Sequence, residues 1–475
     1  MLFGSPSKSG SRTRIEFQAG DISTVSDLTD FIALLEAAGE LHRVAAEVDP
    51  YLEIAAIADR VSKGAGGGRA LLFERVRGHC FPVAINLFGS PQRAALALGP
   101  ASLEAIVDRL EQELVRETGN SSERLRSILE RPEYSPRRVE KAPCKEVTEP
   151  LADFGQLPAL QAWPGDGGRF LTLPQVFTCD PETGERNCGM YRMQIFDAST
   201  AGLHWRPGSD AARHHAAWRQ RGEKMPVAVA LGGDPVLTYA AGAPLPPGLD
   251  EVAYAGFLRG TPLTMTPCTL SELAVPASAE FVLEGYVEPR EERTEGPFGN
   301  HTASYSLPEP CPVFHLRKLL RRRQAIYPCT LVGTPPMEDC WLAKISERLL
   351  LPLLRCDFPQ IININFPIET IFHGCALLSV RTGTGEGRDL LRALWQSRFF
   401  RFSRMLVLVG EEVDVQNAAM VYWQVVNRAD PVRDVIIETG RIGVDATRTA
   451  PGGMVQADPA TRQLVEKRWL EYGFE

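Results

Sequence analysis

The chain has 475 residues, with 51 Lys and Arg against 59 Asp and Glu, and 44% of its residues are hydrophobic. This length predicts about two to four domains. A net charge of −8 argues against a dedicated nucleic-acid binder, which would carry a basic surplus. No uncharged run is long and apolar enough to span a bilayer. The sequence therefore predicts a globular protein with no nucleic-acid partner and no transmembrane segment.

Residues 1–20 form a basic segment that is rich in Ser and Gly and lacks an apolar core. This composition indicates a disordered leader rather than a signal peptide. The ten cysteines include no CxxC pair, which argues against a zinc ribbon and a thioredoxin-type site. Without an export signal, we expect reduced thiols and a cytoplasmic location.

The first block of the chain alternates predicted helices and strands. A helix is predicted between Ser26 as its N-cap and Gly39 at its end, with an apolar face of Leu28, Phe31, Ile32 and Leu35. The pair Asp49-Pro50 is expected to start a second helix. The runs ALLFERV and PVAINLF predict buried strands, and SLEAIVDRLEQELVRE predicts another helix. This alternation is typical of an α/β domain.

The next two blocks differ in character. Residues 118–150 are charged and contain four prolines, which predicts a linker or an extended crossing segment. Residues 151–333 are rich in predicted strands, and Gly and Pro interrupt them at short intervals. These strands are FLTLPQVFT, MYRMQIF, PVAVALGG, FVLEGYVE, PVFHLRKL and AIYPCTLVG. The pattern favours an antiparallel barrel or sandwich.

The third block again predicts an α/β domain. Helices are expected at 343–355, 387–398 and 413–427, and strands at IININF, CALLSV, MLVLVG and VIIET. The tail ATRQLVEKRWLEYGF predicts a final amphipathic helix. We expect its apolar residues to contact the chain's own core or a partner subunit; they are Leu464, Trp469, Leu470 and Tyr472.

Polar residues inside the strand-rich block are the candidates for a site. Asn187 and Arg192 lie five residues apart in an apolar strand pattern, and Arg192 would be costly to bury without a carboxylate or phosphate partner. Glu251 stands beside an apolar run, and Glu295 lies in a turn with Gly and Pro. Singly, such residues more often form structural ion pairs or surface charges. Together they suggest a site for a metal-bound phosphate and an acidic substrate.

Ten stretches stand in order along the chain: LTDFIALLEAAGELHRVAAEVDPYLEIAAIADRV, ALLFERVRG, PVAINLFGS, NCGMYRMQ, VAVALGGDP, AYAGFLRG, VPASAEFVLEGYVE, EGPFGNHT, NRADPVRDV and GVDATR. Through them the sequence resembles the UbiD-type decarboxylase family over nearly its whole length. The resemblance implies a multidomain α/β fold with an N-terminal α/β domain over 21–125. It further implies a central split β-barrel, similar to that of flavin reductases, over 126–333 and a C-terminal α/β oligomerisation domain over 334–475 that ends in a dimerisation helix.

The resemblance also implies a chemistry. Family members are reversible, non-oxidative decarboxylases of aromatic, heteroaromatic or α,β-unsaturated acids. Their cofactors are prenylated FMN, a divalent metal that is usually Mn²⁺, and K⁺. A UbiX-type prenyltransferase supplies the flavin, and members form homodimers or larger homo-oligomers. Losing CO₂ from an sp² carbon leaves an unstable carbanion, and the prenylated flavin accepts those electrons.

Individual roles follow from position in the family's motifs. Arg192 and Glu295 match the arginine and one carboxylate of a catalytic Glu-Arg-Glu/Asp triad. Asn187 and Glu251 match metal ligands, whose oxygen atoms suit a hard cation. The implied cofactor contacts are Met190, Tyr191, Arg192, His204, Trp205 and Arg206.

The chain departs from the family at the metal site. Relatives usually read HWxxHK where this chain reads HWRPGSD, so Gly208 stands at the position of a metal-binding His and Ser209 at a basic position. Two candidate substitutes, His214 and His215, lie six and seven residues further on. A loop that commonly separates the motifs in VIIETGRIGVDATR is also missing.

The other departure concerns protonation. Asn300 replaces the final carboxylate of the triad, and an amide cannot act as a general acid near neutral pH. Protonation is then left to Glu295, His301 or a water. These departures keep an alternative open, namely a non-catalytic or degenerate subunit of a multi-subunit carboxylase. A plain FMN-binding protein is a third interpretation, and the intact candidate ligands and triad residues favour the enzyme.

Overall fold

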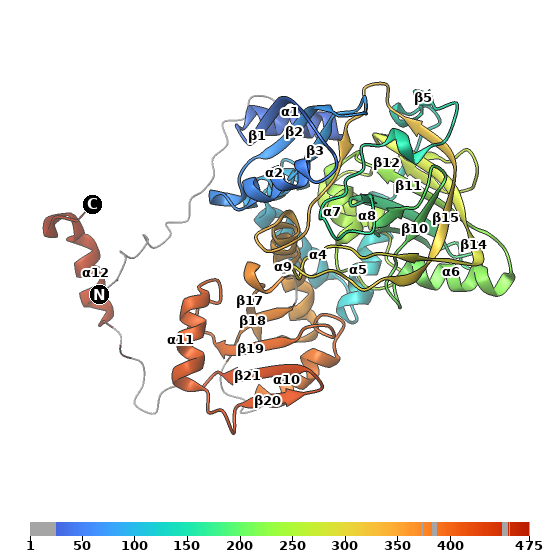
Figure 1. The fold of residues 1–475 in the computed structure, drawn as a ribbon. Helices are drawn as coiled ribbons and strands as arrows, with labels where there is room; N and C mark the ends of the chain where they lie inside the picture. The colour runs from blue at the N-terminus through green and yellow to red at the C-terminus, as the bar shows by residue number, and fades with distance from the viewer. Residues whose placement is uncertain (1–24, 372–373, 382–386, 449–454, 456, 475) are drawn as a thin grey trace.

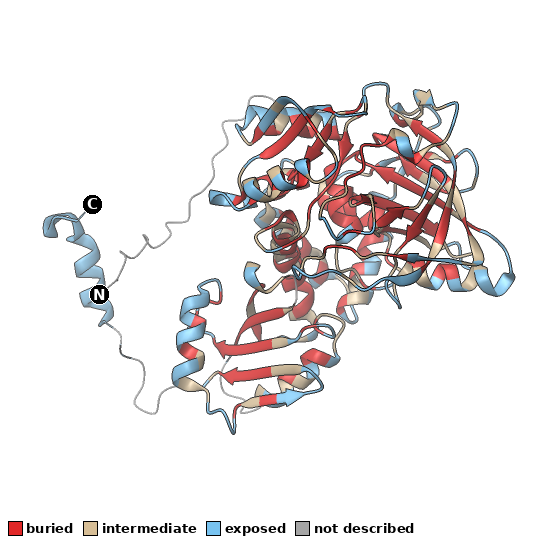
Figure 2. Cartoon of the chain, in the orientation of Figure 1, coloured by how far each residue is buried: buried red, intermediate tan, exposed pale blue. Residues whose placement is uncertain are grey.

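The computed structural model describes residues 25–371, 374–381, 387–448, 455 and 457–474 (Figure 1). The predicted leader over residues 1–20 lies outside the described residues. Within them, helices pack against four β-sheets, and the buried residues follow the sheets and the helices between them (Figure 2). The chain thus has a multidomain α/β architecture, as expected. No helix among the described residues is long and apolar enough to cross a bilayer.

The N-terminal part holds a four-stranded sheet in the order β1-β2-β3-β16. Its elements are α1 (Leu28–Ala37), β1 (Leu41–Val48), α2 (Glu53–Ser62), η1 (Ala65–Gly67), β2 (Ala70–Val76), β3 (Val83–Ile85), α3 (Pro91–Leu98) and α4 (Leu103–Arg116). The predicted apolar face of α1 is confirmed, since Leu28, Phe31, Ile32 and Leu35 are all buried. The N-cap is Asp27 rather than Ser26, because the Asp27 side chain accepts the Asp30 N–H at 2.8 Å.

Two predictions for this part were wrong. Helix α2 begins at Glu53, not at Asp49-Pro50, because the Asp49 side chain accepts the Tyr51 N–H and pairs with Arg77 instead. The expected linker after residue 117 contains helix α5 (Ser121–Leu129). Its N-cap Asn120 forms a capping box with Glu123, a strong start signal that the high charge of the segment obscured. The boundary expected at residue 125 therefore falls inside a helix.

The central part is a nine-stranded sheet in the order β6-β9-β10-β15-β14-β11-β7-β8, with β5 paired to β15. All these pairings are antiparallel. The strands are β5 (Val147–Thr148), β6 (Phe170–Leu171), β7 (Pro174–Cys179), β8 (Arg186–Met190), β9 (Met193–Ile195), β10 (Thr200–Leu203), β11 (Met225–Leu231), β14 (Phe281–Glu295) and β15 (Glu309–Arg321). Among the described strands no pairing joins β6 to β8, so the split barrel stays a prediction.

Helices and a small sheet cover this central sheet. They are η2 (Pro143–Lys145), η3 (Phe154–Gln156), α6 (Asp210–Arg221), α7 (Pro235–Gly242) and α8 (Glu251–Arg259), with β4 (Arg137–Arg138), β12 (Thr264–Pro267) and β13 (Ala274–Pro276) in the order β13-β12-β4. The run MYRMQIF is not one strand, because the ladder breaks between β8 and β9 at Tyr191 and Arg192. AIYPCTLVG supplies only β16 (Tyr327–Pro328), which pairs with β3 of the N-terminal sheet rather than with the central sheet.

The C-terminal part holds a five-stranded sheet in the order β17-β18-β19-β21-β20. Its elements are α9 (Glu338–Asp357), β17 (Ile361–Asn365), η4 (Ile368–Thr370), β18 (Cys375–Val380), α10 (Gly387–Gln396), β19 (Met405–Gly410), α11 (Ala418–Arg428), β20 (Val435–Glu438) and β21 (Arg441–Ala446). The three predicted helices fall on α9, α10 and α11. Strand β18 is parallel to β19 and buried throughout, which explains the uninterrupted apolar run CALLSV.

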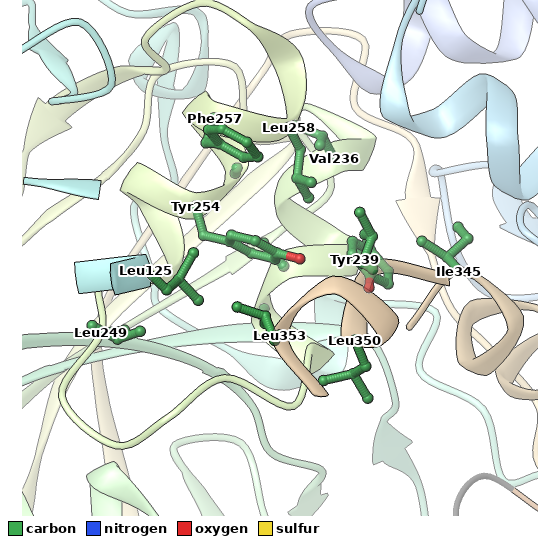
Figure 3. Packing of buried hydrophobic residues seen from close by; sticks show 14 of the residues in the cluster. Leu125, Val236, Tyr239, Leu249, Tyr254, Phe257, Leu258, Ile345, Leu350 and Leu353 are labelled. Carbon is green, nitrogen blue, oxygen red and sulfur yellow. The ribbon is translucent and has the colours of Figure 1, made fainter. Parts of the chain in front are cut away.

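Helix α9 connects the C-terminal part to the centre of the molecule. Figure 3 shows Leu353 of α9 beside Tyr254 of α8, and Leu350 of α9 and Tyr239 of α7 belong to the same buried cluster. The Tyr239 hydroxyl lies 3.1 Å from Ser346 Oγ on α9, which satisfies both buried groups. By contrast, α12 (Pro459–Lys467) and η5 (Trp469–Tyr472) stand apart from the body and are exposed (Figures 1 and 2).

Candidate active site

An ion pair between the half-buried Arg192 and the fully buried Glu295 forms the centre of the site. Arg192 occupies the break between β8 and β9, and Glu295 is the last residue of β14. The guanidinium donates from Nε to Oε1 of Glu295 at 2.8 Å and from Nη2 to Oε2 at 3.0 Å. It also lies over the Phe298 ring, 4.6 Å from the centroid. This paired, planar contact fixes both side chains in orientation.

The Glu295 carboxylate is ionised at neutral pH. Its side chain is 0% exposed, and burial alone would raise its pKa. Hydrogen bonds from His204 and Arg192 outweigh burial and hold the pKa of Glu295 at about 2. In the resting site at neutral pH, Glu295 therefore carries a negative charge and accepts hydrogen bonds from both neighbours.

His204 joins a second carboxylate to this pair. Its Nδ1 lies 3.2 Å from Oε2 of Glu295, and its Nε2 lies 3.4 Å from Oε1 of Glu309. Glu295 and Glu309 face each other across the β14–β15 hairpin. The ring of His204 thus sits between two carboxylates that antiparallel pairing brings together.

Asn300 does not join these contacts. It begins the turn after β14, and its side-chain oxygen accepts the His301 N–H at 2.8 Å. Its backbone N–H donates to Ser304 and its backbone oxygen accepts from Ala303. Of the expected triad, the described contacts therefore bring Arg192 and Glu295 together, while the contacts of Asn300 stay within its own turn.

A second group of candidate site residues lies at the N-terminal end of residues 187–192, whereas Arg192 is at the other end. Glu251 is the first residue of α8, and its Oε2 accepts the Cys188 N–H at 2.9 Å. Burial raises the pKa of Glu251 to about 8, and no Lys or Arg of the described chain pairs with it. A buried carboxylate without a cationic partner suits a bound cation. Its neighbour Asn187, next to Cys188 in β8, offers an amide oxygen.

Hydrogen bonds orient the Asn187 amide. Its Nδ2 donates to Thr178 Oγ1 at 3.2 Å, and Thr178 Oγ1 lies 2.9 Å from Nδ1 of His214 on α6. The Tyr191 hydroxyl donates to Oδ1 of Asn187 at 3.4 Å. Burial raises the pKa of Tyr191 to about 12, so the phenol keeps its proton. The amide nitrogen of Asn187 thus donates to Thr178, and its amide oxygen faces the Tyr191 hydroxyl.

The segment from His204 to Ser209 explains the missing metal ligand. Gly208 has φ +81°, a left-handed conformation that side-chain residues adopt at a cost. Ser209 caps α6 by accepting the Ala212 N–H. His214 contacts Thr178 rather than the Asn187 oxygen, and within the described residues no group of three His, Cys, Asp or Glu could hold a metal. Asn187 and Glu251 each offer oxygen atoms of the kind that a hard cation prefers.

The remaining predicted cofactor contacts differ in their surroundings. The Trp205 ring lies 6.4 Å from the Tyr191 ring and 5.3 Å from the His215 ring, so it packs beside the second group of candidate site residues. Met190 is partly buried against the core that includes α7. Arg206 is exposed in the segment before α6.

Comparison with known proteins decides the family. Three family models match consecutive parts of the chain, namely the N-terminal, Rift-related and C-terminal domains of 3-octaprenyl-4-hydroxybenzoate carboxy-lyase. The matched residues are 32–111, 137–335 and 340–454. The chain belongs to the UbiD family. An uncharacterised protein of Archaeoglobus fulgidus is 42% identical over 476 residues, which cover 94% of this chain and 98% of the relative.

Solved UbiD-class structures share the fold. An evolved dimeric form of HmfF from Pelotomaculum thermopropionicum, in complex with prenylated FMN, is 28% identical with a TM-score of 0.79, covering 92% of this chain and 98% of that chain. Vanillic acid decarboxylase of Sedimentibacter hydroxybenzoicus, in its closed form, is 25% identical with a TM-score of 0.82, covering 94% and 98%. The multidomain α/β fold is therefore that of UbiD-class enzymes.

Sequence reasoning missed several residues of the site. It treated His204 as a cofactor contact and did not connect it with Glu295. It also overlooked Glu309, which lies between the EGPFGNHT motif and the predicted strand PVFHLRKL and is the first residue of the observed β15. Pairing that strand with FVLEGYVE alone would not have placed Glu309 opposite Glu295, because the register of the two strands shifts between Val287 and Glu292. No sequence signal pointed to Thr178, whose contact with Asn187 depends on the β7–β8 register.

Proposed function

We propose that this protein is a reversible, non-oxidative decarboxylase that acts on an aromatic, heteroaromatic or α,β-unsaturated carboxylic acid with prenylated FMN. The observation that carries the proposal is the ion pair between Arg192 and the fully buried Glu295. Near it in the chain, Glu251 accepts the N–H of Cys188, the neighbour of the candidate ligand Asn187. UbiD-class structural neighbours that bind prenylated FMN or decarboxylate aromatic acids support the same conclusion.

Different residues of the chain would bind the metal, hold the substrate and exclude water. Asn187 and Glu251 would hold Mn²⁺ at the flavin phosphate, since both offer oxygen ligands. When bound, prenylated flavin supplies an electron sink for the bond that loses CO₂. Glu295 holds the Arg192 guanidinium through Nε and Nη2, which leaves Nη1 for a substrate carboxylate. Trp205 and Tyr191 exclude water beside the second group of candidate site residues. No described contact assigns residues to K⁺.

The proposal includes partners and a location. A UbiX-type prenyltransferase would supply the flavin, because prenylated FMN forms only when a prenyl group is added to FMN. The exposed apolar residues of α12 and η5, among them Leu464, Trp469 and Leu470, are expected to contact a second subunit in a homodimer or larger homo-oligomer. We place the protein in the cytoplasm, where a flavin supplier and reduced thiols coexist.

A second function is favoured by specific observations. Gly208 supplies no ligand at the position of the family's metal-binding His, and the contacts of Asn300 stay within its turn. These features favour a non-catalytic subunit of a multi-subunit carboxylase. The intact Arg192–Glu295 pair favours the enzyme, because burying the charge of Glu295 costs desolvation energy that a decayed site would have no reason to retain.

The test is a decarboxylation screen. The protein is co-expressed with a flavin prenyltransferase, and CO₂ release is measured from a panel of benzoic, hydroxybenzoic, furoic and cinnamic acids. We expect at least one acid to be decarboxylated by the wild-type protein and not by Arg192→Ala. A loaded protein that releases CO₂ from no acid, and exchanges no ¹³C-bicarbonate into them, would favour the non-catalytic subunit.

A further inference from the structure

Decarboxylation needs a proton that the expected donor cannot provide. In the proposed reaction the C–C bond to the carboxylate breaks, CO₂ leaves, the electron pair stays on the carbon, and a C–H bond forms. One proton is therefore consumed in each turnover. Asn300 has no acidic proton to give, and Glu295 is ionised between Arg192 and His204. Another group must hold the proton near this carboxylate.

His204 is the group whose contacts fit this task. Its Nδ1 lies 3.2 Å from Glu295 Oε2 inside the site, and its Nε2 lies 3.4 Å from Glu309 Oε1. The His204 side chain is 19% exposed, whereas that of Glu309 is 54% exposed. The three residues thus form a line from the buried carboxylate to solvent.

Charge arguments support the same arrangement. Glu295 and Glu309 are cross-strand neighbours, and like charges opposite each other destabilise a sheet. An imidazolium between them offers one N–H donor to each carboxylate. Arg192 also contacts Glu295, and its guanidinium does not release a proton.

We infer that His204 supplies the proton for product formation and that Glu309 connects His204 to solvent. The inference rests on the proposed decarboxylase function. The Nδ1 proton of the imidazolium passes to Oε2 of Glu295, and Glu295 passes a proton to the substrate carbon. The ring regains its proton from solvent on the Glu309 side, so each turnover moves one proton inward. Carboxylation, the reverse reaction, releases that proton by the same route.

The first part of the test measures decarboxylation by matched variants, each loaded with prenylated FMN. We expect His204→Gln to lower kcat about 100-fold, within the range that a positioned acid contributes, with KM changed less than about 2-fold. Glu309→Gln is expected to lower kcat about 10-fold. Added imidazole should partly restore His204→Ala, which a purely structural role would not allow. Glu291→Gln is the control, because Glu291 contacts His315 on the same hairpin at 2.6 Å and should leave kcat unchanged.

The second part of the test needs neither flavin nor turnover. Hydrogen exchange at C2 of histidine rings, followed by mass spectrometry on the full chain, reports the protonation of His204. Glu309→Gln should change the C2 exchange rate of His204, because it removes the carboxylate that lies 3.4 Å from His204 Nε2, and Glu291→Gln should not. Flavin absorbance of each variant shows whether loading is retained.

The two parts of the test separate the possible failures. An unchanged C2 exchange rate of His204 in Glu309→Gln overturns the inference whether or not the protein is an enzyme. Wild-type-like kcat in a loaded His204→Gln variant, or loss of proton delivery in His301→Gln with imidazole rescue there instead, also overturns it. A wild-type protein that releases no CO₂ refutes the proposed function, and the exchange measurement then decides alone whether His204 and Glu309 form a coupled pair.

Discussion

Neutralising Glu295 should destabilise the protein by an amount that the structure sets. A pKa held at about 2 instead of the ordinary 4.5 corresponds to about 3 kcal/mol in favour of the ionised form, since one pKa unit is about 1.4 kcal/mol. Glu295→Gln keeps the shape of the side chain and removes the charge, which leaves Arg192 half-buried and unpaired. We therefore expect a loss of about 3 kcal/mol in the free energy of unfolding at pH 7.

The assay is urea unfolding followed by fluorescence, with Glu309→Gln as the matched control. Glu309 is 54% exposed and makes a longer contact with His204, so its neutralisation should change stability by less than about 0.5 kcal/mol. Because the pKa of Glu295 is lowered on folding, its contribution is present above about pH 4.5 and is lost as the pH falls toward 2. The difference between wild type and Glu295→Gln should fall to about 2 kcal/mol at pH 3.5. Equal unfolding midpoints for the two variants at pH 7 would refute the reasoning.

Three further changes give distinct outcomes. Arg192→Lys should lose decarboxylation as completely as Arg192→Ala, because an ammonium cannot reproduce the paired contact with Glu295; substantial CO₂ release by the Lys variant would contradict this. Gly208→His should raise bound metal, measured by plasma mass spectrometry, because a Cβ there meets no atom within 4 Å, yet it should cost about 1 kcal/mol through its left-handed backbone. Gly208→Ala serves as the control with the same backbone cost and no added ligand, and equal metal content in the two would refute the role. Tyr239→Phe should destabilise the α7–α9 contact by about 1 kcal/mol in urea unfolding, since it leaves Ser346 Oγ without the tyrosine hydroxyl; an unchanged midpoint would show that the hydrogen bond contributes nothing.

The fold was predictable where local patterns were strong. The apolar spacing of α1 identified its buried face, and the continuous apolar run of β18 identified a strand, which the structure buries throughout. Predictions were wrong where pairing over long distances decides the structure. The residues of β16 read as part of the central block but complete the N-terminal sheet. Sequence spacing carries no information on which distant edge a short strand will join.

The candidate site was likewise predictable only in part. Arg192 and Glu295, 103 residues apart, were identified through motif positions, and the structure brings them into direct contact. The bridge from His204 to Glu309 was not foreseen, because it depends on the register of β10, β14 and β15 in one sheet. The high pKa of Glu251 likewise follows from burial, which its neighbours in sequence do not reveal.

Cofactor loading tests the central claim most directly. Native mass spectrometry and an absorbance spectrum are recorded for the protein after co-expression with a flavin prenyltransferase, beside Glu251→Gln and a UbiD-class enzyme known to load. The account predicts a coloured protein whose mass exceeds that of the chain by one prenylated FMN and a divalent metal, and a loss of metal and flavin in Glu251→Gln. A colourless wild-type protein of bare mass, while the reference enzyme loads in parallel, would contradict the account and favour a non-catalytic subunit.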